Sequence, residues 1–348
     1  MSVYKILKFV GVVAALVLIA VGVVGYRLYG RIYGNNMNTS EKKTVFMYIP
    51  TDSDFDFVLS QLQEIGLRDV SSFLWVANKM NYPSRVRSGR YSITDGISNI
   101  DLVRMLRSGQ QVPVNVIFNN IRFNTQLAGA VATFIEADSA SIIALLTDSD
   151  YLMENFNHNP QTIMSMCIPN TYEFFWNTSA SGFLDRMKRE SDRFWTETRL
   201  EKARNANLTP LQVITMASII EEETKQDSEK SRMAGVYVNR INRGMLLQAD
   251  PTLKFALGDF TIQRLLNRDM TIDSPYNTYR YVGLPPGPIC IPSIITIDAV
   301  LNYEKHDYLF FCARVDFSGY HSFARTLQEH SRNAQAYHRA LNNSNIFR

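Results

Sequence analysis

The chain has 348 residues, of which 46% are hydrophobic and 20% are charged, and its formal net charge is +3. This length suits two modest domains with attachments, and the composition is that of a globular rather than a disordered protein. The small charge excess, with no basic stripe interleaved with aromatic side chains, argues against a nucleic-acid-binding protein. The three cysteines form no CxxC pair and are predicted to be separate, mostly buried thiols, although one disulfide stays open: Cys167, Cys290 and Cys312.

The N-terminal region predicts a membrane helix. Residues 9–26 carry no charge, and about 18 residues at ~1.5 Å each span ~27 Å, close to the ~30 Å hydrocarbon core of a bilayer. The run is longer than the apolar part of a signal peptide and no A-x-A site follows it, which favours a retained single-pass anchor over a cleaved signal. Lysines and arginines lie on both sides, so the positive-inside rule slightly opposes an external body. Residues 27–43 are expected to form a tether.

Residues 44–118 are predicted to form a small α+β module. TVFMYIP and GRYSITDG read as strands, and QVPVNVIF reads as a third. The Asp52, Asp54 and Asp56 alternation is predicted to cap a helix rather than to bind calcium, because the glycine and glutamate of a calcium loop are missing. Ser98 is expected to cap a second helix that Gly109 ends.

Residues 119–208 are mainly helical in pattern and rich in aromatic side chains, interrupted by CIPNTYEFFW. The next region, residues 209–341, opens with a strong helix signal: Thr209 as N-cap, Pro210 in the first helical position and Gln212 completing a capping box. A loop-rich stretch follows, then a strand-like YLFFCARV and a closing polar helix from about Thr326 to Leu341. Residues 342–348 are a tail.

Three glutamates follow the apolar run of the helix at Glu221, Glu222 and Glu223. At 100° per residue, Glu222 projects into the most polar sector and is expected to face solvent, whereas Glu221 and Glu223 face apolar surroundings. A carboxyl group beside isoleucine side chains has a raised pKa, as a general acid near neutral pH requires. Glu223, at the helix's end, is the better catalytic candidate. The alternative is a structural ion pair with Arg232 or Arg240.

Six segments in order then match a family. They are ASIIEEET with Glu223, VYVNRI with Asn239, LLQADPT with Gln248 and Asp250, SPYNTY with Asn277 and Tyr279, GLPPGPI, and HSFARTLQEHSRN. Together they resemble the YceG-like, or MltG-type, endolytic murein transglycosylases of bacteria. The resemblance is close from about residue 209 to residue 337. It is looser over the N-terminal helix and the first module, which resembles the LysM-like subdomain of that family.

The resemblance implies an α+β protein in which a cytoplasmic tail (1–8) and an inner-membrane helix (9–26) precede the body on the outer face. It implies a LysM-like module (44–118), a helical connecting region (119–208) and a catalytic domain (209–341). The implied substrate is peptidoglycan, cut within glycan strands to leave 1,6-anhydro-N-acetylmuramic acid ends without a cofactor. The family's essential glutamate corresponds to Glu223. Because the family places such enzymes beside the synthases that extend glycan strands, these synthases are candidate partners and cutting would end chain growth.

Such a lyase needs one carboxyl group, which protonates the glycosidic oxygen and then takes the proton of the muramyl C6 hydroxyl as that oxygen attacks C1. An ordinary glycosidase needs a second carboxylate. Asp250 is the obvious candidate for one, but an N-cap role before Pro251 is favoured.

Several motif residues offer amide, phenol or carboxylate groups that could bind the sugars' acetamido and hydroxyl substituents. The predicted substrate-binding set is Asn239, Gln248, Asp250, Asn277 and Tyr279. For each polar residue the alternative is that it satisfies backbone groups of its own loop. The GLPPGP segment is expected to form a rigid wall of the groove.

Four histidines in the C-terminal region, His306, His321, His330 and His338, raise a zinc hypothesis. No H-E-x-x-H or other matched ligand spacing occurs, so structural hydrogen bonding is favoured and no metal site is predicted.

The chain also departs from the family pattern. Met164-Ser165 stands where Glu-Gly is common, and IFNNIRF lacks a second Glu-Gly. These departures put substrate contacts there in doubt. Two alternatives stay open: a non-catalytic peptidoglycan-binding scaffold and a plain muramidase.

Overall fold

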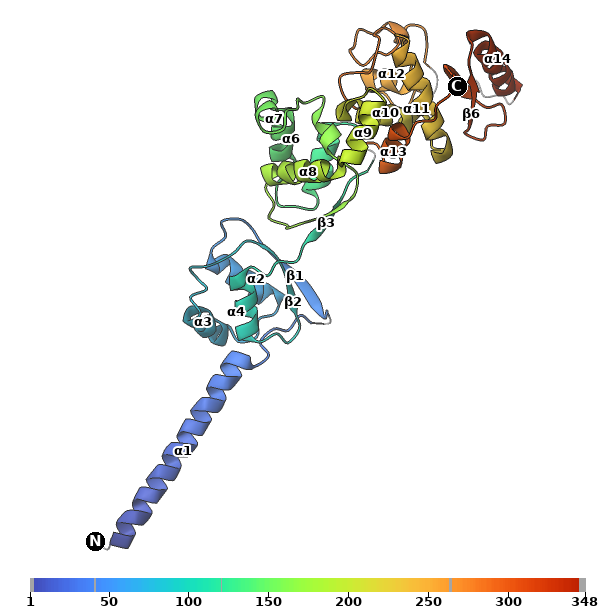
Figure 1. Ribbon diagram of the computed structural model, residues 1–348. Coiled ribbons are helices and arrows are strands. Elements are labelled where there is room, and N and C mark those ends of the chain that lie inside the picture. The colour runs from blue at the N-terminus through green and yellow to red at the C-terminus, as the bar shows by residue number, and fades with distance from the viewer. Residues whose placement is uncertain (1–2, 41, 120, 263–264, 344–348) are drawn as a thin grey trace. The chain divides into compact units, whose positions relative to one another are not determined.

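The computed structural model describes residues 3–40, 42–119, 121–262 and 265–343, which form a mixed helix and strand structure (Figure 1). Contacts divide the chain into two units. Unit 1 comprises residues 1–114 and 173–178, and unit 2 comprises residues 115–172 and 179–348.

Unit 1 begins with helix α1 (Val3–Tyr33), which is apolar over most of its length. By length and composition α1 is able to cross a membrane, and none of its apolar segment is buried in the protein. The helix continues past the predicted span, so the expected tether at 27–43 is wrong in its first part: residues up to Tyr33 are helical. The last turn is fixed to the rest of the unit, because the Asn99 side chain donates a hydrogen bond to the carbonyl of Arg31 (2.9 Å).

The rest of unit 1 packs three helices against a strand pair. Strands β1 (Thr44–Ile49) and β2 (Gly89–Thr94) are antiparallel with Thr44 opposite Thr94. Helices α2 (Phe55–Ile65), α3 (Val70–Lys79) and α4 (Asn99–Ser108) share with the strands one core that contains the fully buried rings of Phe73, Tyr82 and Tyr91.

The predicted caps of this unit are confirmed. The Asp54 carboxylate accepts the amide of Phe57 at the start of α2, Ser98 caps α4, and Gly109 ends α4 in the left-handed region (φ 74°). Helix α3 was not predicted.

Unit 2 is mainly helical. Strands β3 (Val114–Ile117) and β4 (Thr171–Phe174) form a two-stranded sheet, in which Val114, Glu173 and Phe174 are assigned to unit 1 and the other residues to unit 2. Strands β5 (Phe310–Ala313) and the unpredicted β6 (His321–Ala324) form another sheet, which belongs to unit 2. The helices that precede residue 209 are α5 (Asn124–Ala132), α6 (Ser139–Thr147), α7 (Ser149–Phe156), η1 (Ile163–Met166), α8 (Ala180–Phe194) and α9 (Glu197–Asn205). The later ones are α10 (Pro210–Glu223), α11 (Asp227–Asn242), α12 (Asp250–Leu257), η2 (Asp269–Thr271), α13 (Ile294–Leu301) and α14 (Leu327–Asn343).

Helix α10 is the centre of this unit. Its residues from Val213 to Ile220 are all buried, and α9, α11, α12 and α13 pack around it (Figure 1). A helix that is apolar on every side is stable only when it is surrounded in this way. The predicted domain boundaries inside residues 119–341 stay predictions.

The capping box at the start of α10 is confirmed: Thr209 Oγ1 accepts the amide of Gln212 (3.3 Å), and Gln212 Oε1 accepts the amide of Thr209 (2.8 Å). We expect Thr209→Ala to lower the free energy of unfolding by about 1 kcal/mol, because it leaves an orphan amide at the helix start. Thr209→Ser keeps the acceptor and should stay near the wild type. Urea denaturation measures both, and equal losses in the two variants would contradict the capping role.

Candidate active site

The three consecutive glutamates at the end of α10 have three different environments. Glu221 accepts hydrogen bonds from Ser293 and Thr296 and pairs with Lys230 (3.2 Å), whose side chain is almost fully buried. Burial of Glu221 alone would raise its pKa, but these donors together lower the pKa below its usual value. The expectation that Glu221 faces apolar surroundings is therefore wrong, because a second helix and the start of a third bring it a cation and two hydroxyl groups.

Glu222 is also not the solvent-facing residue that the helix geometry predicts. Its carboxylate forms an ion pair with Arg122 (2.8 Å), and only 14% of its side chain is exposed. The Arg122 guanidinium also lies over the ring of Phe260 (4.4 Å to its centre). The ion pair of Glu222 thus connects α10 to the segment that leads into α5.

Glu223 has no ion pair with a lysine or arginine anywhere in the described part of the chain. Its Oε1 accepts a hydrogen bond from the Tyr237 hydroxyl of α11 (3.0 Å). Burial raises its pKa to about 8; the negative charge of Asp250 adds to this effect, while the Tyr237 hydrogen bond and Lys254 oppose it. This agrees with the predicted direction of the shift, and it leaves a carboxyl group that holds its proton at neutral pH.

The two arginines proposed as structural partners of Glu223 bind elsewhere. Arg232 pairs with Glu304 (3.0 Å). Arg240 is buried and donates to the carbonyls of Leu309 (2.6 Å), Leu246 (3.0 Å) and Leu247 (2.8 Å). Arg240 therefore ties the segment before α12 to the segment before β5 instead of neutralising Glu223.

The Glu223 side chain lines a cavity of about 820 Å³ in unit 2. Its walls come from the end of α10, from α11, from the segment around Gln248, from β5 and from α14. The lining residues include Glu223, Arg240, Gln248, Asp250, Tyr279, Phe310, Phe311, Cys312, His321, His330 and Tyr337. Such a volume is in the range of ligand-binding sites.

Three of the predicted binding residues line this cavity: Gln248, Asp250 and Tyr279. Asp250 does not cap α12 as predicted: the N-cap is Ala249, and Asp250 is the first helical residue and accepts a hydrogen bond from the Tyr279 hydroxyl. Gln248 has a positive φ (50°), a conformation that is unfavourable for a residue with a side chain. Its backbone amide donates to the carbonyl of Thr278 (3.0 Å), which holds the strained turn.

The other two predicted binding residues do not line the cavity, and their amides have other partners. Asn239 donates to the carbonyls of His306 (2.7 Å) and Tyr308 (3.0 Å). Asn277 is fully buried and donates to two backbone carbonyls of its own loop, while its oxygen accepts the amide of Tyr279 (3.0 Å). For these two residues the geometry favours the alternative, in which the side chain satisfies backbone groups.

The GLPPGP segment does not line the cavity either. A Cβ on Gly287 would lie 2.1 Å from the carbonyl oxygen of Gln161, so the segment requires glycine there to pack against the earlier part of unit 2. The amide of Ile289 donates to Ser218 Oγ (3.0 Å) on α10. The segment predicted to be a wall of the groove therefore packs against α10 and supports it, and does not contact the cavity.

Sequence reasoning missed Glu229, which is 4% exposed and accepts two hydrogen bonds from His321, one from its backbone amide (2.9 Å) and one at Nδ1 (3.1 Å). This pair fixes the His321 ring on the cavity wall, edge-on to Phe311 (5.6 Å between centres). A carboxylate in the first turn of α11 gave no distinctive signal, because its partner lies on a strand that was not predicted. His330 stacks on Phe310 (5.3 Å). The three cysteines are free thiols, as predicted, and Cys312 lines the cavity.

Comparisons with known proteins identify the family and several relatives of this chain. The model of the YceG-like family matches residues 47–336. An endolytic murein transglycosylase of Bacillus subtilis (strain 168) is 28% identical over 328 residues, 90% of each chain. A protein with the same name from Streptococcus pneumoniae (serotype 2, strain D39) is 26% identical over 329 residues, 85% of this chain and 59% of its own length. The crystal structure of a YceG-like protein from Listeria monocytogenes has a TM-score of 0.55 at 25% identity, covering 84% of this chain and 99% of that one.

The two neighbours of Glu223 act on its pKa in opposite directions, which gives a paired test. We expect Tyr237→Phe to raise the pKa above about 8, because it removes a donor that stabilises the carboxylate, and Asp250→Asn to lower it, because it removes a nearby negative charge. Carbon NMR titration of glutamate-labelled protein measures both shifts, with Glu223→Gln identifying the signal. Shifts of the same sign in the two variants would contradict this electrostatic account.

Proposed function

The chain belongs to the YceG-like family, and we propose that it is an endolytic murein transglycosylase, a lyase that cuts peptidoglycan within its glycan strands and leaves 1,6-anhydro-N-acetylmuramic acid ends. The observation that carries the proposal is the state of Glu223. It is the one member of the glutamate run without a cationic partner among the described residues, it has a pKa near 8, and it opens into a large cavity. The relatives from Bacillus subtilis and Streptococcus pneumoniae that bear this name support the same reaction.

In this mechanism Glu223 is both acid and base. Its carboxyl proton passes to the oxygen that links N-acetylmuramic acid to N-acetylglucosamine as the bond to C1 breaks. The resulting carboxylate then takes the proton of the muramyl C6 hydroxyl while that oxygen bonds to C1, which closes the anhydro ring and restores the acid. No water is consumed, and no second carboxyl group is needed to activate one.

Asp250 has an electrostatic role in this scheme. Its charge raises the pKa of Glu223 and so keeps the acid protonated. A negative group on the cavity wall also stabilises the positive charge that develops on the sugar ring as the bond to C1 breaks. The Tyr279 hydroxyl holds the Asp250 carboxylate in place. Gln248, beside them, is the proposed hydrogen-bonding partner of the sugar substituents, whereas Asn239 and Asn277 position the walls.

The membrane arrangement is also part of the proposal. Helix α1 would be a retained single-pass anchor in the inner membrane, with the body of the chain on the outer face, and residues 44–118 would form a LysM-like module. The exposed apolar surface of α1 and its length support an anchor. A position beside the synthases that extend glycan strands follows from the resemblance, and cutting there would end strand growth.

We expect Glu223→Gln to lower the release of products from purified sacculi by about 100-fold or more, because the general acid and base are both lost. Glu222→Gln is the matched control on the same helix turn: it loses the Arg122 pair and some stability, but the folded protein should still release products. Chromatography with mass spectrometry measures both the amounts and the mass of the new ends.

The same experiment separates the alternatives. An anhydro end is one water lighter than a hydrolysed end, so a heavier product identifies a plain muramidase. Equal release by the wild type and by Glu223→Gln would support a non-catalytic scaffold.

The pH dependence of kcat/KM gives an independent test. Because the acid must be protonated in the free enzyme, kcat/KM should fall tenfold per pH unit once the pH exceeds about 8. Initial rates on soluble glycan strands between about pH 4 and pH 10 measure this limb. A fall that is complete below pH 6 would show that Glu223 is ionised at neutral pH and would contradict its role as the acid.

A further inference from the structure

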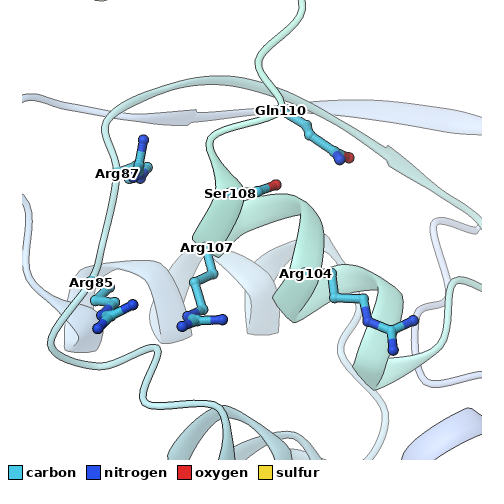
Figure 2. A pocket seen from close by; sticks show the side chains of 6 residues that line it. All are labelled: Arg85, Arg87, Arg104, Arg107, Ser108 and Gln110. Atoms are coloured by element: carbon cyan, nitrogen blue, oxygen red, sulfur yellow. The ribbon is translucent and has the colours of Figure 1, made fainter.

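Unit 1 contains a hollow of about 480 Å³ that the proposed reaction does not use. Figure 2 shows the side chains around it: three come from α4, one from the residue after its cap, and two from the loop that leads into β2. The lining residues are Arg85, Arg87, Arg104, Arg107, Ser108 and Gln110. Four of these six side chains are guanidinium groups.

The local structure explains why the arginines gather. Arg104 and Arg107 are three residues apart on α4 and so lie on one face. Arg85 and Arg87 are two residues apart in the segment without regular structure that leads into β2, and both side chains line the hollow. The left-handed turn at Gly109 brings the two groups together, since a Cβ on Gly109 would lie 2.9 Å from Arg87 Cδ.

General basicity does not account for the cluster. Residues 34–114 hold nine lysines and arginines and eight aspartates and glutamates, so this part of the chain is nearly neutral. Within the described residues only Arg104 has a carboxylate nearby, an exposed Asp101 at 3.6 Å. No carboxylate there pairs with Arg85, Arg87 or Arg107, and the Arg107 Nε is buried without an acceptor. The dipole of α4 favours a cation at its last turn, which explains Arg107 alone.

The position of the hollow argues against a membrane headgroup as its ligand. Helix α4 begins beside the last turn of α1, where Asn99 binds the carbonyl of Arg31, and leads away from it (Figure 1). The ten residues of α4 span ~15 Å, so its last turn is distant from the contact with α1. The hollow lies at that last turn, where Arg104, Arg107 and Ser108 line it.

We propose that this hollow binds the carboxylate groups of the acidic peptides attached to the glycan strands, and so holds the wall polymer on unit 1. The identity of the polymer rests on the proposed function. Planar guanidinium groups pair with carboxylates through two parallel hydrogen bonds. Ser108 and Gln110 add a hydroxyl and an amide, which suit the peptide groups next to a carboxylate better than a bare phosphate.

The test uses the full chain in detergent, with Glu223→Gln so that the polymer is not cut. The probes are purified sacculi freed of phosphate polymers with hydrofluoric acid, and the same glycan strands after an amidase has removed the peptides. We expect at least tenfold tighter binding to the peptide-bearing material. Adding Arg85→Gln, Arg87→Gln and Arg107→Gln should remove that preference and leave the binding of peptide-free strands unchanged.

The matched control removes the same charge from exposed positions of unit 1 outside the hollow, as Lys42→Gln, Lys43→Gln and Arg68→Gln, and should keep the preference. The proposal is overturned if the variant without the three arginines of the hollow still binds peptide-bearing material more tightly. It is also overturned if the control variant loses this preference. If binding that requires the three arginines is seen only with sacculi that have not been treated with hydrofluoric acid, the ligand of the hollow is a phosphate polymer instead. Cleavage of peptide-free strands by the chain with Glu223 intact tests the proposed function separately, so the two can fail independently.

Discussion

The site depends on one constraint: Glu223 is partly buried at the end of α10 and has no ion pair within the described residues, while cations of neighbouring segments have other partners. Lys230 is held by Glu221 and Asp227, Arg122 is held by Glu222, and Arg240 donates to three backbone carbonyls. The first two glutamates of the run are therefore paired with cations, whereas the only cation that lowers the pKa of Glu223 is Lys254, and its effect is smaller than that of burial. Burial raises the pKa of Glu223, the charge of Asp250 adds to this effect, and no ion pair within the described residues reverses it.

That arrangement makes the stability of the fold depend on pH. In the unfolded chain Glu223 would lose its proton near the usual value of 4.5, whereas in the folded chain it keeps the proton up to about pH 8. The folded state therefore binds more protons between these values, and its stability falls as the pH rises through them. Glu221, whose pKa is lowered, contributes in the opposite sense, because its stabilising ion pair and hydrogen bonds are lost as the pH falls. Two glutamates of the same helix turn thus change the stability in opposite directions as the pH rises.

The sequence predicts local features better than it predicts partners. The caps of α2, α4 and α10 depend on side chains within a few residues, and all three are confirmed. The helix geometry also predicted the raised pKa of Glu223. It failed for Glu221 and Glu222, because Ser293, Thr296 and Arg122 approach from segments about 70 to 100 residues away. A single helix viewed alone contains no information about which of its polar positions another segment will cover.

The same limit explains the outcome for the amide-rich motifs. Asn239 and Asn277 look suited to sugars by residue type, yet loops without regular structure leave backbone carbonyls that must be satisfied, and these amides do so. What remains open to the cavity is the aromatic surface of β5 and α14, with Phe310, Phe311 and Tyr337. Sugar rings present apolar C–H faces that pack on aromatic rings, while their hydroxyl groups remain free for a few polar contacts. The walls that contact the glycan would then be supplied mainly by the last forty residues, and the amides of the earlier motifs would hold those walls around Glu223.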